Sequence, residues 1–351
     1  MVYHQNYVKF HISHGLPLIK ADEKVGYKGG ISKVYHKGLH HNVAKIDVSS
    51  MYPSVMLRYG ITSRKDPLMK SLSVLKYLTE ERLKLKALSA KGDKNAYHMQ
   101  AALKILINSF YGFLGVGYYT YNDMEAAALV TAIGRKILFR MIDKIESMGG
   151  LVIAVDTDGI IYSHQDTNAV YHEVTKVLPS DIEIELEFER TGIFAPKAKN
   201  YVLVREDGKV ECKGLYRKRN RYPLQNKHPL EMIRRYFVEG KESAIAYHID
   251  TVLAIKTRQI DIADLTISRR IGKAEKALVV QGLGQVGDTI SYWTTEEKRF
   301  SAKGKQLKSK QMGTRTEPYW VEHYLDDANE AFIEIFGKDE LDNIFRSNQS
   351  T

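Results

Sequence analysis

The sequence predicts an α+β fold: a mixed sheet with an inserted helical hairpin, followed by a mainly helical and basic region. Three observations predict it. Apolar residues recur at helical spacing over 70–111 and again over 124–148, where a Gly-Gly pair ends the pattern. Short apolar runs typical of strands follow over 151–163, and apolar and polar residues alternate over 183–190. From about residue 223 the spacing is mainly helical, and lysine and arginine are frequent.

The first part of the chain predicts a strand and two helices. VAKIDV (43–48) is typical of a short strand, and the turn-prone string SSMYPS follows it. Residues 70–90 place apolar side chains at helical spacing, SAKGDKN (89–95) predicts a turn, and 96–111 predicts a second helix. We therefore expect 70–111 to form a helical hairpin.

The middle of the chain predicts strands. LVIAVD and GIIYS, within 151–163, predict a β-hairpin with Asp-Thr-Asp-Gly (156–159) at its tip. EIELEFER (183–190) alternates strictly. NYVLV (200–204) and KVECKGL (209–215) predict a further antiparallel pair, because the turn-forming residues REDG lie between them.

The composition is that of an ordinary globular protein with an excess of positive charge. The chain has 351 residues, 44% of them hydrophobic, and a formal net charge of +10. No apolar run reaches the ~18–20 residues of a membrane helix, and Cys212 is the only cysteine. We expect a protein of the reducing cytoplasm, in a bacterial, archaeal or viral-host cytosol, without a membrane partner. Basic clusters at 217–221, 269–276 and 298–310 favour nucleic acid as a partner.

Three acidic residues carry the first chemical signal. Asp156 and Asp158 lie one residue apart between apolar runs, and Asp47 ends the strand at 43–48. Buried carboxylates of like charge are costly unless a positive group compensates them. Mg²⁺ prefers such oxygen ligands together with substrate phosphates. The alternative is that Asp-Thr-Asp-Gly is only a polar hairpin turn.

The predicted helical hairpin carries the second signal. Lys104, Asn108 and Tyr111 are spaced i, i+4, i+7 and share one helix face, and Arg82 and Lys86 lie one turn apart on the partner helix. Three cations directed at one point suit a triphosphate. The alternative is an ordinary solvated face.

These stretches together resemble family B DNA polymerases. DVSSMYPSVM (47–56) resembles the first polymerase motif, and KILINSFYG (104–112) matches the Lys-x-x-x-Asn-Ser-x-Tyr-Gly pattern of the second. DTDG (156–159) resembles the third, with glycine in place of the usual final serine. KAKNYVLV (197–204) is similar to the fourth, and YKGG (27–30) to the signature that precedes the polymerase core. LTISRRI and PYWVEHYLDDANEAFIEIFG resemble thumb segments.

The resemblance implies a right-hand polymerase with a palm sheet, helical-hairpin fingers and a mainly helical thumb. It implies an N-terminal linker at 1–26, palm at 27–64, fingers at 65–103, the end of the fingers and the rest of the palm at 104–222, and a thumb at 223–351. Residues 1–26 contain no Asp-x-Glu motif, so we expect no proofreading by this chain.

The resemblance also implies a two-metal centre. Asp47 and Asp158, with the main-chain carbonyl of Val48, would hold two Mg²⁺ ions, for which Mn²⁺ would substitute, and Asp156 would be a supporting acid. One of the alternating glutamates on 183–190 is a candidate further acid, although a solvated sheet face explains them equally well. The two candidates are Glu187 and Glu189.

Nucleotide and DNA contacts follow from the same resemblance. Tyr52 would lie under the sugar and fill the space of a ribose 2′-hydroxyl. The implied dNTP-binding residues are Ser50, Met51, Tyr52, Arg82, Lys86, Lys104 and Asn108. The implied primer–template contacts are Tyr27, Gly29, Gly30, Tyr111, Gly112, Lys197, Lys199, Tyr201, Arg269 and Arg270.

The expected activity is template-directed transfer of a nucleotide from a dNTP to a primer 3′-hydroxyl. Alternatives are the catalytic subunit of a split polymerase with a separate nuclease chain, a polymerase that uses RNA or ribonucleotides, and a non-catalytic DNA-binding subunit. The tail ELDNIF (340–345) weakly resembles segments that bind a sliding clamp, but a frayed terminal helix is the favoured interpretation.

Overall fold

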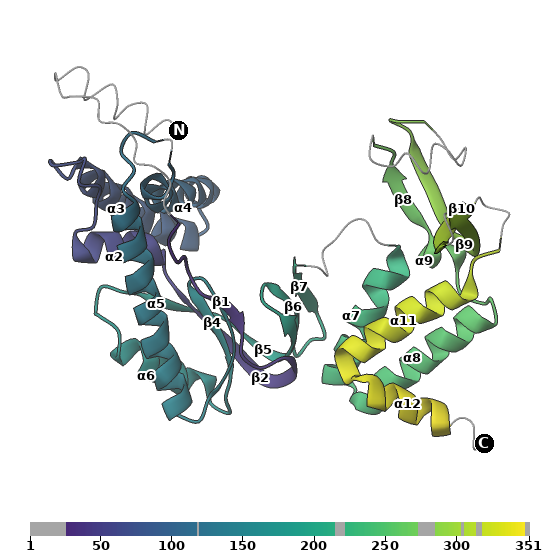
Figure 1. Cartoon of the computed structure of the whole chain (residues 1–351). Helices are drawn as coiled ribbons and strands as arrows, with labels where there is room; N and C mark the ends of the chain where they lie inside the picture. Colours follow the sequence, from purple (N-terminus) through teal and green to yellow (C-terminus); the bar gives the residue numbers. More distant parts are fainter. Residues whose placement is uncertain are drawn as a thin grey trace. The chain divides into compact units, whose positions relative to one another are not determined.

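The computed structural model describes residues 26–117, 119–214, 222–272, 285–302, 305–313 and 318–347. The chain divides into two compact units (Figure 1). Unit 1 comprises Met1–Tyr35 and Ala44–Glu189, and unit 2 comprises His36–Val43 and Arg190–Thr351. Within the described residues, no helix is both long and apolar enough to cross a membrane.

Unit 1 is built on a sheet with helices packed against it (Figure 1). Its strand order is β1-β3-β4-β2-β5, where β2 and β5 continue into unit 2. The strands are β1 Ser32–Val34, β2 Gly38–Val48, β3 Leu151–Asp156, β4 Gly159–Ser163 and β5 Ile184–Lys197. The predicted hairpin at 151–163 is confirmed, and its strands pair antiparallel with Asp156 opposite Gly159.

The helices of unit 1 confirm the predicted helical hairpin and add two helices that the sequence pattern did not reveal. The helices are α2 Met51–Tyr59, α3 Lys70–Ala90, α4 Lys94–Leu114, α5 Met124–Ser147 and α6 Thr167–Lys176. We expected a turn at SSMYPS, but the chain turns only at Ser49 and Ser50 and then enters α2. Pro53 fits there because it lies in the first turn, where its missing N–H removes no helical hydrogen bond.

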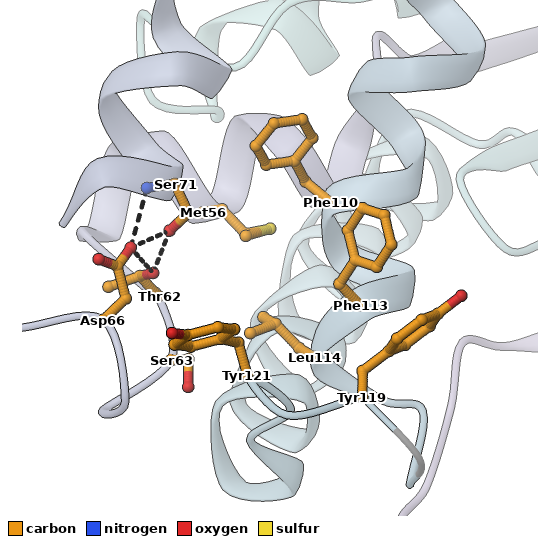
Figure 2. A pocket seen from close by; sticks show the side chains of 10 residues that line it. All are labelled: Met56, Thr62, Ser63, Asp66, Ser71, Phe110, Phe113, Leu114, Tyr119 and Tyr121. Atoms are coloured by element: carbon orange, nitrogen blue, oxygen red, sulfur yellow. Dashed lines mark hydrogen bonds between the residues drawn. The ribbon is translucent and has the colours of Figure 1, made fainter. Parts of the chain in front are cut away.

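The start of α3 is fixed by Asp66 (Figure 2). Its carboxylate accepts hydrogen bonds from the backbone N–H of Lys70 at 3.1 Å and of Ser71 at 2.8 Å, and from the Ser71 hydroxyl at 2.6 Å. These bonds satisfy N–H groups that the first turn of a helix leaves unpaired. Asp66 thereby sets where the helical hairpin α3–α4 begins.

The core of unit 1 lies between α5 and the sheet. The central face of α5 is fully buried, as Leu138 and Met141 show, and it packs in one cluster with Ile46 of β2 and Ile160 of β4. Burying side chains of this size stabilises the fold by about 1.5–3 kcal/mol each. The ends of β2 and of the β3–β4 hairpin are therefore held on a rigid support.

Unit 2 contains more strand than the sequence pattern predicted. We expected a mainly helical region after residue 223, but three strands pair there in the order β10-β9-β8. The run TISYWTT at the start of β9 is rich in β-branched and aromatic residues, which favour strands. The strands of unit 2, besides its parts of β2 and β5, are β6 Asn200–Val204, β7 Val210–Lys213, β8 Ile267–Arg270, β9 Thr289–Ala302 and β10 Lys305–Gly313.

The helices of unit 2 bury their apolar faces against one another. They are α7 Pro223–Val238, α8 Lys241–Lys256, α9 Ile262–Leu265, α11 Val321–Phe336 and α12 Lys338–Ser347. The terminal stretch ELDNIF lies on α12, where Leu341 is buried and Ile344 packs against the cluster around Phe332. Leu341 and Ile344 thus serve the core of unit 2, whereas the Phe345 side chain is exposed.

Candidate active site

The end of β2 and the tip of the β3–β4 hairpin meet in unit 1. The Val48 N–H donates a hydrogen bond to the Asp158 carbonyl oxygen at 2.9 Å. Asp47 lies directly against Gly159, because a Cβ atom added to that glycine would stand 1.8 Å from Oδ1 of Asp47. The two motifs that contain Asp47 and Asp158, more than 100 residues apart in the sequence, are therefore adjacent in the fold.

The turn between Asp156 and Asp158 is strained. Thr157 has a φ of 64°, and the Asp158 N–H donates to the Asp156 carbonyl at 2.8 Å, across this one residue. A β-branched residue rarely adopts a left-handed backbone conformation. The Thr157 N–H is held by the Ile31 carbonyl at 2.7 Å, which helps to fix the turn.

Lys45 adds a buried cation that the sequence reasoning missed. Its side chain is 8% exposed, and Nζ donates to Oδ2 of Asp47 at 2.6 Å and also to Glu187. Burial alone would lower the pKa of Lys45, but the hydrogen bonds and charges of the two carboxylates raise it above its ordinary value. The only signal was a lysine inside the apolar strand VAKIDV, two residues before Asp47 and hence on the same face.

The carboxylates of this cluster lie in a partly desolvated environment. Burial raises the pKa of Asp47 to about 6. Burial also raises the pKa of Asp158, while the positive charges of Lys45 and Lys104 oppose the shift. Oδ1 of Asp47 is buried and has no hydrogen-bond partner among the described residues. A buried, unpartnered carboxylate oxygen is unfavourable by itself and fits coordination of a hard cation.

Of the two candidate further acids, Glu187 is in the described part, and its carboxylate contacts Lys45. The side chain of Glu189 lies outside the described part of the structure. No group of three or more His, Cys, Asp or Glu side chains within the described ranges could hold a metal ion.

The predicted phosphate-binding residues of α3 and α4 face the turn between β2 and α2. Nη1 of Arg82 lies 3.4 Å from the Ser50 hydroxyl. Nε of Arg82 is buried without a hydrogen-bond partner among the described residues. Lys104 is exposed; its positive charge opposes the rise that burial causes in the pKa of Asp158, and adds to the lowering of the pKa of Glu185 by Lys86.

Lys86 has a partner that the sequence did not indicate. Its Nζ donates to Glu185 at 2.5 Å, and the same oxygen accepts from the Ser49 hydroxyl at 2.9 Å. The hydrogen bond from Lys86 lowers the pKa of Glu185. Glu185 thus links the helix α3 to the turn that follows β2. Asn108 and Lys104 remain exposed on α4, one turn apart.

Three tyrosines from separate segments meet beside the carboxylates. The ring centroids of Tyr52 and Tyr111 are 4.3 Å apart, and the hydroxyls of Tyr111 and Tyr27 are 2.9 Å apart. Burial raises the pKa of Tyr52, and the negative charge of Asp158 raises it further, so the hydroxyl stays protonated near neutral pH. The structure therefore brings together YKGG, α2 and α4.

Two further residues of α5 anchor the YKGG loop. Nη1 of Arg135 donates to the carbonyls of Lys28 and Gly29, both at 2.6 Å, and the Thr131 hydroxyl donates to the Lys28 carbonyl at 2.9 Å. Sequence reasoning missed both residues. Their spacing of four on α5 would have placed them on one helix face, but nothing in the sequence indicates what that face contacts.

The remaining predicted DNA contacts belong to unit 2. Lys197 ends β5, Lys199 occupies the left-handed position of the following turn with a φ of 60°, and Tyr201 is buried on β6. Nζ of Lys213 lies 5.5 Å from the Tyr201 ring centroid. Arg270 donates to the Gly287 carbonyl at 2.9 Å, and the Arg269 side chain is outside the described residues.

Two further predicted DNA contacts, Gly29 and Gly112, belong to unit 1. A Cβ atom on either glycine would meet open space.

Comparison with known proteins places these features in a family. A model of DNA polymerase family B matches residues 68–286. The chain is 29% identical over 279 residues to a DNA polymerase of Archaeoglobus fulgidus, covering 70% of this chain and 36% of that protein. It is 25% identical over 273 residues to DNA polymerase 1 of Saccharolobus solfataricus, covering 68% of this chain and 30% of that protein. It thus spans about a third of the length of these relatives.

The fold is also similar to a solved structure. The family B DNA polymerase of Pyrobaculum calidifontis superposes with a TM-score of 0.68, covering 94% of this chain and 49% of that chain at 20% sequence identity. At this identity the likeness concerns the fold, namely a combination of helices and antiparallel sheet.

Proposed function

The chain belongs to DNA polymerase family B, and from this premise we propose that it extends a DNA primer on a DNA template. The primer 3′-oxygen would form a bond to the α-phosphorus of a dNTP while pyrophosphate leaves. Primer–template DNA and dNTPs are the implied partners, and a divalent cation is the implied cofactor. We propose Mg²⁺, because the oxygen ligands available are those that this ion prefers.

The contact between Asp47 and Gly159 is the observation that best supports the proposal. It brings the first and third polymerase motifs together and leaves a buried oxygen of Asp47 without a hydrogen-bond partner among the described residues. Asp47, Asp158 and the Val48 carbonyl would hold the ions, and Asp156 would support them. When bound, Mg²⁺ would activate the attacking hydroxyl and stabilise the leaving pyrophosphate.

The chain's own cations would position the nucleotide. The guanidinium of Arg82, beside Ser50, would bind a phosphate oxygen, and the exposed ammonium of Lys104 would add a second positive charge. Lys86 would join them when it leaves Glu185. The main-chain amides of Ser50 and Met51 would face the phosphates, and Asn108 would line the pocket. Such groups accelerate the reaction by orientation and by stabilising charge.

The tyrosine cluster would hold the sugar and the nascent pair. Tyr52 would lie under the deoxyribose, and Tyr111 and Gly112 would lie at the nascent pair. Tyr27, Gly29 and Gly30 would contact the template strand or the primer. Lys197, Lys199, Tyr201, Arg269 and Arg270 of unit 2 would contact DNA phosphates.

The polymerase subdomains follow from the same proposal. The sheet of unit 1 would be palm, α3 and α4 the fingers, and the helices of unit 2 the thumb. In the alternative of a split polymerase, this chain would have the same activity and would work together with a separate nuclease chain. We do not add a clamp partner to the proposal, because Leu341 and Ile344 pack within unit 2 and only Phe345 of the apolar side chains in ELDNIF is exposed.

Primer extension by the purified chain tests the proposal. With Mg²⁺, dNTPs and a DNA primer–template we expect extension, and the variant Asp158→Asn should lose it by about 10²-fold or more because a charged ligand becomes neutral. DNA binding, measured by fluorescence anisotropy, should persist in the variant. Equal extension by both proteins would overturn the assignment.

The same assay separates the alternatives. Ribonucleotides and an RNA template should be poor substrates, and a non-catalytic DNA-binding subunit would bind the primer–template without extending it. Omitting dNTPs tests the expectation that the chain does not proofread, because a 3′–5′ nuclease would then shorten the primer.

A further inference from the structure

The ring of Tyr52 is enclosed by three segments of unit 1. Its face lies 4.3 Å, between centroids, from the ring of Tyr111 on α4. A Cβ atom added to Gly30 would lie 2.7 Å from its hydroxyl oxygen, and one added to Gly134 of α5 would lie 3.3 Å from its ring atom Cε1. The face of the Tyr52 ring thus lies against α4, its hydroxyl against the YKGG segment and its edge against α5. We call this enclosure, made by Gly30, Gly134 and Tyr111, the tyrosine slot.

Glycine at position 30 leaves the space that the Tyr52 hydroxyl occupies. A side chain there would stand closer to the tyrosine hydroxyl than Cβ atoms normally approach another heavy atom, so one of the two would have to move. The loop carrying Gly30 is anchored by hydrogen bonds from Arg135 to the carbonyls of Lys28 and Gly29. The ring is the more mobile partner, and a substitution would push it out of its position.

Gly134 lies in the interior of a helix, where glycine lowers stability. The closeness of the Tyr52 ring explains why a glycine stands there. Gly in a helix interior destabilises by about 0.5–1 kcal/mol relative to Ala. A methyl group at this buried position of α5 would lie 3.3 Å from Cε1 of Tyr52 and 3.3 Å from Sδ of Met51. The helix therefore leaves out a side chain where the tyrosine edge passes.

We propose that Gly30 and Gly134 are specificity-determining residues: with Tyr111 they fix the Tyr52 ring, and thereby set how strongly the site excludes ribonucleotides. The inference rests on the proposed function, in which Tyr52 lies under the sugar. A ring in contact at its face, its edge and its hydroxyl resists displacement by the extra oxygen of a ribonucleotide, and it therefore excludes the 2′-hydroxyl sharply. A displaced ring would no longer fill that space.

The test compares Gly30→Ala with Gly26→Ala. Both change a glycine of the segment that precedes β1, but a Cβ atom at position 26 meets no atom within 4 Å. For each protein kcat/KM is measured with a dNTP and with the matching rNTP. We expect the ratio to fall about tenfold in Gly30→Ala, as for the loss of a favourable contact of ordinary size, and to remain near the parent value in Gly26→Ala.

A second pair of variants identifies the contact. In Tyr52→Phe the ring remains, but the hydroxyl that Gly30 faces is gone. Adding Gly30→Ala to this variant should therefore change the ratio far less than it does in the parent, and such non-additivity is the signature of a direct contact. Equal changes in both backgrounds would mean that position 30 acts on the site by another route, which would overturn the slot.

The outcomes distinguish the slot from the proposed function. If the parent does not extend a primer, the proposed function fails and the slot fails with it. If the parent extends and Gly30→Ala keeps the parent ratio, only the slot is wrong. Should Gly30→Ala unfold, Gly134→Ala tests the slot from the ring edge, with a smaller expected fall in the ratio because its contact is longer, and an unchanged ratio there would overturn it.

Discussion

Gly159 and Asp47 are in direct contact, and the contact leaves no room for a side chain at position 159. A Cβ atom there would stand 1.8 Å from Oδ1 of Asp47 and 2.8 Å from Cε of Lys45. The chain departs at this position from the serine that is usual in the motif it resembles. Lys45, whose ammonium lies between Asp47 and Glu187, occupies the neighbouring space. The lysine at position 45 can therefore lie where it does because residue 159 has no side chain.

Restoring the usual serine should consequently harm this protein. We expect Gly159→Ser to displace the Asp47 carboxylate and to reduce primer extension at least about tenfold, as misplaced reacting groups commonly do. Steady-state extension at saturating DNA measures the effect. The control is Gly26→Ala, where a Cβ atom meets open space. Full activity of Gly159→Ser would contradict the close contact.

Replacing the buried lysine should make the protein depend on divalent cations for stability. In Lys45→Met the partly buried carboxylate of Asp47 and the half-exposed carboxylate of Glu187 lose their cation. A fully buried charge left without its partner destabilises a fold by about 3–5 kcal/mol, and we expect a smaller loss for these partly solvated groups. Cations that bind the folded state restore stability. We expect a lower melting temperature without metal and a larger upward shift with Mg²⁺ or Mn²⁺ than in the parent.

The matched control for this change is Lys84→Met. Lys84 forms an exposed ion pair with Glu81 on α3, at 2.6 Å, and exposed pairs contribute little to stability. The variant should show the metal-induced shift of the parent. If Lys45→Met and Lys84→Met responded to metal alike, Lys45 would not be the counterion of these carboxylates.

The sequence predicted the elements that depend on local pattern. The helix over 70–90 and the hairpin with Asp156 and Asp158 at its tip needed only periodicity and turn residues. Lys45 and Arg135 were not found, because their partners Glu187 and Gly29 lie more than 100 residues away in the sequence. Contacts between residues so far apart in the sequence produce no regular spacing that a single sequence could reveal. The strand β9 was missed for another reason. Its first half, TISYWTT, is rich in strand-forming residues, but its basic second half is also typical of a nucleic-acid-binding surface.

Arg135, which anchors the YKGG loop, should affect the binding of primer–template DNA more than the binding of dNTP. Arg135→Gln removes a charged donor that holds two carbonyls at 2.6 Å, so Tyr27 and Gly30 lose a fixed support. Charged hydrogen bonds of this kind contribute about 1.5–3 kcal/mol. We expect the KM for primer–template to rise about tenfold, with a smaller change in the KM for dNTP. Arg140→Gln, an exposed position of the same helix, should leave both values near those of the parent.

Unit 2 should lose stability in mild acid because of two buried histidines. Nε2 of His228 and Nδ1 of His248 are 3.1 Å apart, each side chain is almost fully buried, and burial lowers their pKa values to about 3 and about 4. Both are therefore neutral in the fold at pH 5, whereas unfolded histidine has a pKa of about 6.5. The unfolded chain binds the additional protons, so the stability present above pH 6.5 is lost progressively as the pH falls toward 4.

Urea denaturation at pH 7.5 and at pH 5 measures this loss. Trp293 and Trp320, the only tryptophans, both belong to unit 2, so their fluorescence reports its unfolding. We expect about 2 kcal/mol less stability at pH 5 for each histidine, from its shift at that pH. His228→Gln should be less stable than the parent at pH 7.5 but should lose less on acidification, whereas exposed His98→Gln should follow the parent at both pH values. An equal acid-induced loss in all three proteins would show that other groups, and not the buried pair, control the acid sensitivity of unit 2.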